Sequence, residues 1–551
     1  MRDVIRSLPF LALTVVLGGC GNDSNEDAGL STSVVPEGYA ATGEEPARPR
    51  IGDGTLYNRE AVIPPQCYTR TEGQYNPCYT CHQSYDDETR PNSMADGFLQ
   101  GDYNFSELGV TNHWKNLFVD RRTDIQAIAD DEIRDYIAQD NYAPWIERLA
   151  ADDDWQGPVP RIEDLAEGAA AFDEYGLAKD GSGWVAFNYK PLPSTFWPTN
   201  GSTDDVMIRL PEAYRTAACG DDAGRFSRDV YFANLALLEM GMQDLAQTTL
   251  PPVDENSVCA DLNGDGQMGV VTEIQARTHY LGAAAGEPVR RMTYPEDTQF
   301  IHTVRYVGLA GESIVPSRRM KEVRYMKKVR SFNNAQLRSL YGNERQEKLD
   351  GNLPVFTDQG DQGLSNGMGW LVLGFIENAD GELRKQNYQE QLFCMGCHTT
   401  LGATVDQTFA FPRKVSGAEG WGYINLEGMQ DVPAKGEIEG EILQYLKRVG
   451  GGNEFRENPE MQARWFDANG NVREDAVKQA DVYELITPSV DRALALNKAY
   501  RVIVEEQSFA YGRDATVVPA KNVYHHVDPE KAPPLEPEHR VTGYDIRLDW
   551  Q

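Results

Sequence analysis

The chain has 551 residues, and its 85 acidic against 52 basic residues give a formal net charge of -33 at pH 7. A field of this sign repels nucleic acid and anionic lipid and attracts basic partners, which excludes a nucleic-acid-binding protein. The length is too great for one hydrophobic core and predicts roughly two to four packed units.

The first residues have the three parts of an export signal. Arg2 and Arg6 precede an apolar stretch at 8–17, and two glycines stand before Cys20. So short a stretch does not cross a hydrocarbon layer of about 30 Å as a helix. The end of the stretch resembles the lipobox of bacterial lipoproteins, which implies cleavage and acylation at Cys20. Gly21, where an aspartate would favour retention, implies the outer membrane. An ordinary secretory signal is the alternative.

Composition and periodicity divide the chain into further segments. Residues 20–55, rich in Gly, Ser, Asp, Glu and Pro, predict a flexible tether after the signal peptide at 1–19. Residues 56–150 are loop-rich at first and have helical spacing over 124–150. The next segment, 151–345, is predicted as an α+β insert.

In this insert, 183–190 and 299–309 alternate as half-buried strands do, and 226–245 reads as one buried helix. The segment 346–451 contains helix-like sequence from about residue 386 to 451. The last segment, 452–551, predicts helices at 475–486 and 490–507 before an extended, proline-rich tail. The predicted fold class is mainly α, with loop-rich regions and an α+β central insert.

Two Cys-x-x-Cys-His motifs carry the clearest chemical signal, at Cys78–His82 and Cys394–His398. The spacing sets two thiols one helical turn apart and places a histidine directly after the second thiol. Covalent attachment of haem needs two thiols for its two vinyl groups and a histidine below the iron. A zinc or iron–sulfur site and a thioredoxin-like dithiol are the alternatives, but metal cages want four ligands.

Both motifs therefore resemble the attachment sites of c-type cytochromes. The resemblance implies two covalently bound haem c groups, held by Cys78, Cys81, His82, Cys394, Cys397 and His398. Residues 394–451, with Glu427-Gly428-Met429 and the run Ile438–Lys447, resemble a small class I cytochrome c, which implies Met429 as a distal iron ligand. As a whole, the chain resembles the dihaem lipoproteins of respiring bacteria.

The distal iron ligands are open to alternatives. For the first haem, His113 is the preferred ligand, and Met94 is nearer in the sequence. For the second, the choice lies between Met429 and His302, which stands in the strand pattern of the insert. Surface or core histidines would give the same pattern.

The remaining cysteines are Cys67, Cys219 and Cys259. In an oxidising compartment they predict one disulfide and one odd cysteine. We pair Cys219 with Cys259, because each borders a polar, turn-forming stretch of the central segment. Cys67 is left unexplained.

A loop in the central segment has oxygen ligands at alternate positions. Asp261, Asn263 and Asp265 follow the first half of an EF-hand loop, with Gly266 at the turn. Thr272 stands where the bidentate acid belongs. The loop predicts either a calcium site or an ordinary Asx-rich turn.

These patterns together predict a dihaem c-type cytochrome that transfers electrons between redox partners at the cell envelope. Its partners would be other redox proteins, mostly basic, and its membrane contact the N-terminal lipid. The alternative is an enzyme of the dihaem peroxidase or oxygenase type, with one open haem iron and a pocket in the insert. A third hypothesis is a passive surface adhesin in which the haems have only a structural role. We predict no catalytic residue.

Overall fold

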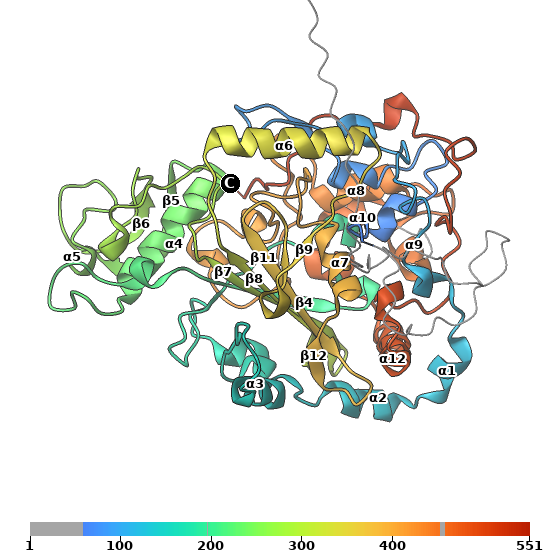
Figure 1. The fold of residues 1–551 in the computed structure, drawn as a ribbon, viewed down its shortest axis with the longest axis horizontal. Coiled ribbons are helices and arrows are strands. Elements are labelled where there is room, and N and C mark those ends of the chain that lie inside the picture. Colours follow the sequence, from blue (N-terminus) through green and yellow to red (C-terminus); the bar gives the residue numbers. More distant parts are fainter. Residues whose placement is uncertain (1–58, 196, 452–457, 551) are drawn as a thin grey trace, which may run out of the picture.

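The computed structural model describes residues 59–195, 197–451 and 458–550. Cys20 and the predicted signal peptide and tether lie outside these residues. A central antiparallel sheet runs through the molecule, and helices surround it (Figure 1). No helix of the described part is both long and apolar enough to cross a membrane.

The sheet has eight strands in the order β3-β4-β7-β8-β11-β10-β9, and β12 also pairs with β11. All of its pairings are antiparallel. The strands are β3 (Val185–Ala186), β4 (Thr203–Arg209), β7 (Gln299–Ala310), β8 (Ser313–Lys328), β9 (Thr357–Asp358), β10 (Leu364–Ser365), β11 (Trp370–Glu377) and β12 (Leu383–Lys385). Two small hairpins lie apart from it: β1 (Ser84–Tyr85) with β2 (Met94–Ala95), and β5 (Gln247–Asp254) with β6 (Val270–Gln275).

Twelve α-helices are distributed around the sheet in the described residues. They are α1 (Arg122–Ala127), α2 (Asp130–Ile137), α3 (Tyr142–Ala151), α4 (Arg228–Gln243), α5 (Glu255–Val258), α6 (Asn334–Leu349), α7 (Tyr388–Met395), α8 (Glu441–Val449), α9 (Pro459–Trp465), α10 (Glu474–Gln479), α11 (Val482–Ile486) and α12 (Val490–Glu506). The hairpin β5–β6 and α4 project together on one side of the sheet, whereas α7, α8 and α12 lie on the other (Figure 1).

The two longest predicted helices are confirmed in the structure. The sequence predicted 226–245 and 490–507, and the structure has α4 at Arg228–Gln243 and α12 at Val490–Glu506. Ser227 and Ser489 each accept a backbone N–H of the first turn, which fixes where these helices begin. The prediction at 475–486 is divided into α10 and α11, and the strand predicted at 299–309 is β7.

The predicted fold class, mainly α, is wrong. The structure has 33% helix and 19% strand, with a large antiparallel sheet of eight strands. Strand β8 was not predicted from the sequence. Its residues are strongly charged and include Pro316, which is unusual for a central strand. Its buried Arg319 pairs with Glu377 at 2.7 Å, and its buried Glu322 pairs with Arg324 at 2.9 Å. Ion pairs in the interior therefore hide the apolar alternation that identifies a strand.

One hydrophobic cluster joins distant parts of the chain. Its buried members run from Ala61 near the start of the described chain to Ile546 near its end. Helix α4 and the segment around Trp421 contribute to this cluster, and Cys67, Cys81 and Cys394 pack against it. The two Cys-x-x-Cys-His motifs are thereby placed on the same core.

Candidate functional site

The first motif lies on a short 3-10 turn, Cys78–Thr80. The backbone N–H of His82 donates to the Cys78 carbonyl at 2.9 Å, so the motif forms a single helical turn. Asn76 precedes the turn and its Oδ1 accepts the N–H of Tyr79 at 3.1 Å. The fully buried ring of Tyr79 packs edge-on against Tyr544 at 4.9 Å between centroids. The motif is therefore anchored by a residue close to the end of the chain.

The second motif begins in the last turn of α7, which contains Cys394 and ends at Met395. Asn387 begins this helix with a capping box, in which Asn387 and Glu390 each accept the other's backbone N–H. The N–H of His398 donates to the Cys394 carbonyl at 3.3 Å, which repeats the turn of the first motif. The two motifs, far apart in sequence, thus have the same local geometry.

The two motifs lie side by side. A Cβ added to Gly402, just after the second motif, would stand 2.6 Å from the carbonyl oxygen of Cys81. Arg90 joins the segments that follow the motifs, because its Nη1 donates to Gln83 Oε1 at 3.1 Å and to the Gly402 carbonyl at 2.9 Å. The close approach therefore requires a residue without a side chain at 402.

Cys67 belongs to the same cluster. Burial raises the pKa of its thiol well above the usual range, and negative charge on Cys78, Cys81 or Cys397 would raise this pKa further. Five cysteines, Cys67, Cys78, Cys81, Cys394 and Cys397, form no disulfide with one another. Sequence reasoning left Cys67 unexplained because one of its neighbours, Cys397, belongs to the second motif and is far away in the sequence.

The thiols of Cys78 and Cys397 are protonated at neutral pH. Burial raises the pKa of Cys78 and of Cys397 to about 12. A thiol attacks as its thiolate, and the reactive cysteines of dithiol oxidoreductases have lowered pKa values. The electrostatics therefore count against the thioredoxin-like alternative.

The two motif histidines carry neutral rings. Burial lowers the pKa of His82 and of His398 to about 4. Nδ1 of His398 donates to the Gln407 carbonyl at 2.9 Å, which fixes the tautomer and leaves the lone pair on Nε2. Nδ1 of His82 is buried without a hydrogen-bond partner among the described residues.

The predicted distal ligands have local partners in the structure. Nε2 of His302, on β7, lies 2.9 Å from Asp204 Oδ2, although His302 is close enough to His398 to lower its pKa. Nε2 of His113 lies 3.4 Å from the Leu108 carbonyl.

Met429, the methionine predicted as a distal iron ligand, is part of the hydrophobic core. Met429 is 8% exposed and belongs to the main hydrophobic cluster. Its N–H donates to the Leu426 carbonyl, and its own carbonyl accepts from Val482 at 2.8 Å. These contacts give Met429 a packing role at the start of α11.

The predicted calcium loop is an Asx-rich turn. Asp261 accepts the N–H of Gly264 at 2.6 Å and of Gly266 at 2.9 Å. Asn263 and Asp265 accept backbone N–H groups two residues further on, at 3.0 and 2.7 Å. The same side chains that an EF-hand turns toward its ion are directed here at the loop's own backbone.

The cofactor prediction, two covalently bound haem c groups and calcium, is contradicted. Residues 59–195, 197–451 and 458–550 contain no group of three or more His, Cys, Asp or Glu side chains that could hold a metal ion. The ligand sets were inferred from spacing along the chain. In the structure, His302 forms a hydrogen bond with Asp204. The carboxylate of Asp261 accepts hydrogen bonds from backbone amides of its own loop.

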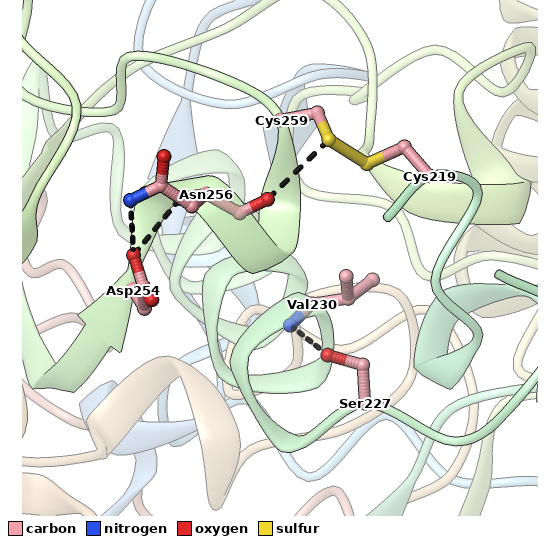
Figure 2. Close-up of a disulfide and its surroundings, with 6 residues drawn as sticks. All are labelled: Cys219, Ser227, Val230, Asp254, Asn256 and Cys259. Carbon is pink, nitrogen blue, oxygen red and sulfur yellow. Dashed lines mark hydrogen bonds between the residues drawn. A yellow bond between two sulfur atoms is a disulfide. The ribbon is translucent and has the colours of Figure 1, made fainter. Parts of the chain in front are cut away.

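The structure joins Cys219 to Cys259 with an S–S distance of 2.02 Å, the pair expected from the sequence (Figure 2). Cys259 directly follows α5, and the N–H of Asn256 at the start of α5 donates to Asp254 Oδ1 at 3.0 Å. The bond encloses α4 and β5, which lie between the two cysteines.

Comparison with known proteins identifies the family. A family model described as "-like lipoprotein" matches residues 51–484, which is more than half of the chain. The chain belongs to this lipoprotein family. It is also 30% identical over 534 residues to an "Uncharacterized lipoprotein" of Aquifex aeolicus (strain VF5), covering 86% of this chain and 88% of that protein. No solved structure matches it significantly. The family is one of membrane-anchored lipoproteins of the cell envelope.

Proposed function

We propose that this lipoprotein transfers electrons at the cell envelope, and that the cysteine cluster of the two motifs is its redox centre. The observation that carries the proposal is the meeting of two Cys-x-x-Cys-His turns, from distant parts of the chain, in one site. The close approach of Gly402 to Cys81 and the bridge through Arg90 support it. Sulfur and neutral imidazole are the side-chain groups from which proteins most often build redox centres.

The surroundings of the centre suit exchange of electrons better than attack on a substrate. Protonated thiols at Cys78 and Cys397 are poor nucleophiles, because the thiolate is the attacking form. Burial also keeps the imidazoles of His82 and His398 uncharged.

We further propose the outer membrane as its location, with acylation at Cys20, and a basic protein as its electron partner. Gly21 after the acylated cysteine supports the location. The net charge of -33 supports the partner, because a strong negative field accelerates encounter with basic proteins.

Redox titration of the protein purified from its own membrane tests the proposal. We expect a reversible signal that disappears when Cys78, Cys81, Cys394 and Cys397 are all replaced by alanine. The matched control is Cys219→Ala with Cys259→Ala, which removes two sulfurs far along the chain and should keep the signal. Absence of a reversible signal, or its persistence in the fourfold variant, would contradict the proposal.

Mass spectrometry of the two motif peptides identifies the electron-carrying group. Loss of two hydrogen masses within the cluster shows a disulfide. A larger mass excess on a peptide shows a group bonded to the thiols. Unmodified thiols in both the oxidised and the reduced protein would contradict the assignment of these cysteines.

A further inference from the structure

Helix α6 (Asn334–Leu349) runs along the outside of the molecule, at the upper edge of the view in Figure 1. None of the four hydrophobic clusters in the described part of the chain contains a side chain of this helix. Leu337 is its one buried residue, whereas α12, which has a similar length, has nine. Helices in proteins are stabilised mainly by an apolar face packed on a core, so α6 lacks the usual attachment.

Polar contacts hold α6 against the segment that follows the second motif. Thr399 and Thr400 come directly after His398. Their hydroxyls donate to Glu344 Oε2 at 3.1 and 3.4 Å, and Nζ of Lys348 donates to the Thr400 carbonyl at 2.5 Å. Both threonines are buried, with exposed fractions of 5% and 1%. The helix is therefore part of what shields these residues from solvent.

Another contact of α6 involves the residue that orients His398. The carbonyl of Gln407 accepts from His398, and the side-chain Nε2 of Gln407 donates to the hydroxyl of Tyr341 on α6 at 3.3 Å. Gln407 is itself buried. The loop from His398 to Gln407 thus contacts α6 near both of its ends.

The same helix contacts the segment that follows the first motif. Nζ of Lys348 lies 2.5 Å from Asp96 Oδ2, and the N–H of Asp96 donates to the carbonyl of Gln83, the residue after His82, at 3.0 Å. Burial is the main cause of the lowered pKa of His82, and Lys348 is close enough to lower this pKa further. Lys348 therefore connects α6 to the segments that follow both motifs.

The C-terminal half of α6 borders a cavity of about 480 Å³. Glu344 and Glu347 line it from the helix, and residues 352–357 and 365–367 line its other sides. Asn366, one of these residues, donates from Nδ2 to the His398 carbonyl at 3.1 Å, so the cavity extends to the second motif. Side chains that face a cavity lose dispersion contacts there. The helix is therefore loosely packed beside the residues that it shields.

We propose that α6 is a cover that opens as a unit while the sheet and the other helices stay folded, and that its opening exposes residues 399–407 to solvent. The contacts that hold α6 closed are hydrogen bonds and one ion pair, and water can replace such contacts at a small net cost. Segments with few buried apolar contacts are the ones that open locally in folded proteins. The opening follows from these contacts alone, whereas its use, to admit an electron partner to the second motif, rests on the proposed function.

Hydrogen exchange of the full mature protein, followed by mass spectrometry of its peptides, tests the opening. A detached helix of this length is only marginally stable in water, so its amides exchange in the open form. We expect the α6 peptide to exchange about a hundredfold faster than the α12 peptide, which is held by its buried apolar side chains. Exchange of α6 as slow as that of α12 would overturn the proposal.

Two matched lysine variants test whether α6 covers the loop. Lys348→Met removes the ion pair and the bond to the Thr400 carbonyl. It should accelerate the exchange of α6 and of the 399–407 peptide together, by about tenfold or more, the effect of losing a charged hydrogen bond. Lys385→Met is the control, because the Nζ of Lys385, on β12, also contacts one carbonyl and one carboxylate oxygen, at 2.8 and 3.0 Å. The control should leave both rates unchanged.

The α12 peptide reports on the rest of the fold in the same experiment. It should exchange at the parent rate in Lys348→Met, because the rest of the protein stays folded when α6 opens. Equal acceleration of α12 would show unfolding of the whole protein and would overturn the opening of α6 as a unit. Acceleration of α6 without the 399–407 peptide would overturn its assignment as a cover.

The outcome is separable from that of the proposed function, because hydrogen exchange needs no redox signal. Coupled exchange of α6 and residues 399–407, in a protein whose fourfold cysteine variant keeps its redox signal, supports the cover and contradicts the redox centre. A redox signal that depends on the cysteines, with slow exchange of α6, overturns the cover alone.

Discussion

Nδ1 of His398 donates a hydrogen bond to the carbonyl oxygen of Gln407, with 2.9 Å between the two atoms. The bond holds the ring in one orientation and one tautomer. Burial lowers the pKa of this histidine and of His82 to about 4, so both rings remain neutral in the folded protein at pH values where an exposed histidine is charged.

The lowered histidine pKa values predict a pH dependence of stability. Between about pH 6.5 and pH 4 the unfolded chain binds protons that the folded chain does not, so stability is complete above pH 6.5 and falls on acidification. Urea unfolding at pH 7 and pH 5 should show the loss. In a variant with His82→Gln and His398→Gln the loss should be smaller, and an unchanged slope would contradict the assigned pKa values.

The buried pair of Arg413 and Glu441 predicts a large effect of one substitution. Their side chains are fully buried and form two hydrogen bonds, at 2.8 and 2.6 Å. Glu441→Gln leaves the cation without its counter-charge and should lower the free energy of unfolding by about 3–5 kcal/mol. Glu439→Gln, a partly exposed partner of Lys447, is the control and should cost less than about 1 kcal/mol.

The same pair predicts behaviour in acid. Burial by itself raises the pKa of Glu441, but Arg413 and Lys190 outweigh this effect and lower the pKa to about 2. The contribution of this carboxylate is therefore complete above its unfolded pKa, about 4.5, and is lost as the pH falls through about 2. Acid titration of the parent and Glu441→Gln proteins should converge at low pH, and parallel curves would contradict this pKa.

The disulfide predicts a measurable loss of stability on removal. Cys219 and Cys259 are 40 residues apart, and the bond restricts the unfolded chain between them. Replacing both by alanine should lower the free energy of unfolding by about 2–4 kcal/mol. Reducing agent should destabilise the parent protein and leave the double variant unchanged; equal sensitivity of the two proteins would place the relevant sulfurs elsewhere.

The Asx-rich turn predicts that Asp261 stabilises the loop without an ion. Asp261→Ala removes two accepted hydrogen bonds and should lower the free energy of unfolding by about 1–2 kcal/mol. The melting temperature of the parent should be the same in calcium and in chelator. A calcium-dependent increase that Asp261→Ala abolishes would restore the EF-hand interpretation.

Lipoprotein membership predicts attachment at Cys20, which lies outside the described residues. Cys20→Ala should release the protein from the membrane fraction into the soluble one, since the lipid is the predicted anchor. Immunoblots of the separated fractions measure this. Retention of the variant on the membrane would place the anchor elsewhere.

Local sequence signals predicted local structure well. The helix at Arg228–Gln243 could be found because its apolar residues are contiguous. The pairing of Cys219 with Cys259 followed from the redox compartment and the nearby turns. In each case the deciding interactions lie within a few tens of residues.

Contacts between residues that are far apart in the sequence could not be predicted from local patterns. The central sheet was underestimated because β8 buries charged side chains whose partners, such as Glu377, lie on other strands. The place of Cys67 depends on Cys81 and Cys397, which only the fold brings together. The calcium prediction failed because an EF-hand and an Asx-rich turn use the same residue types.

The packing of the first motif against the end of the chain has a consequence for biogenesis. Asn76 donates to the carbonyl of His539, 463 residues later, and Tyr79 packs against Tyr544. A lipoprotein is exported with its amino end first. The thiols of Cys78 and Cys81 therefore emerge long before the segment that covers them, and they stay open to enzymes outside the cytoplasm throughout translocation. Arrival of the last residues closes this interval, so a chain truncated near its end would leave the first motif permanently uncovered.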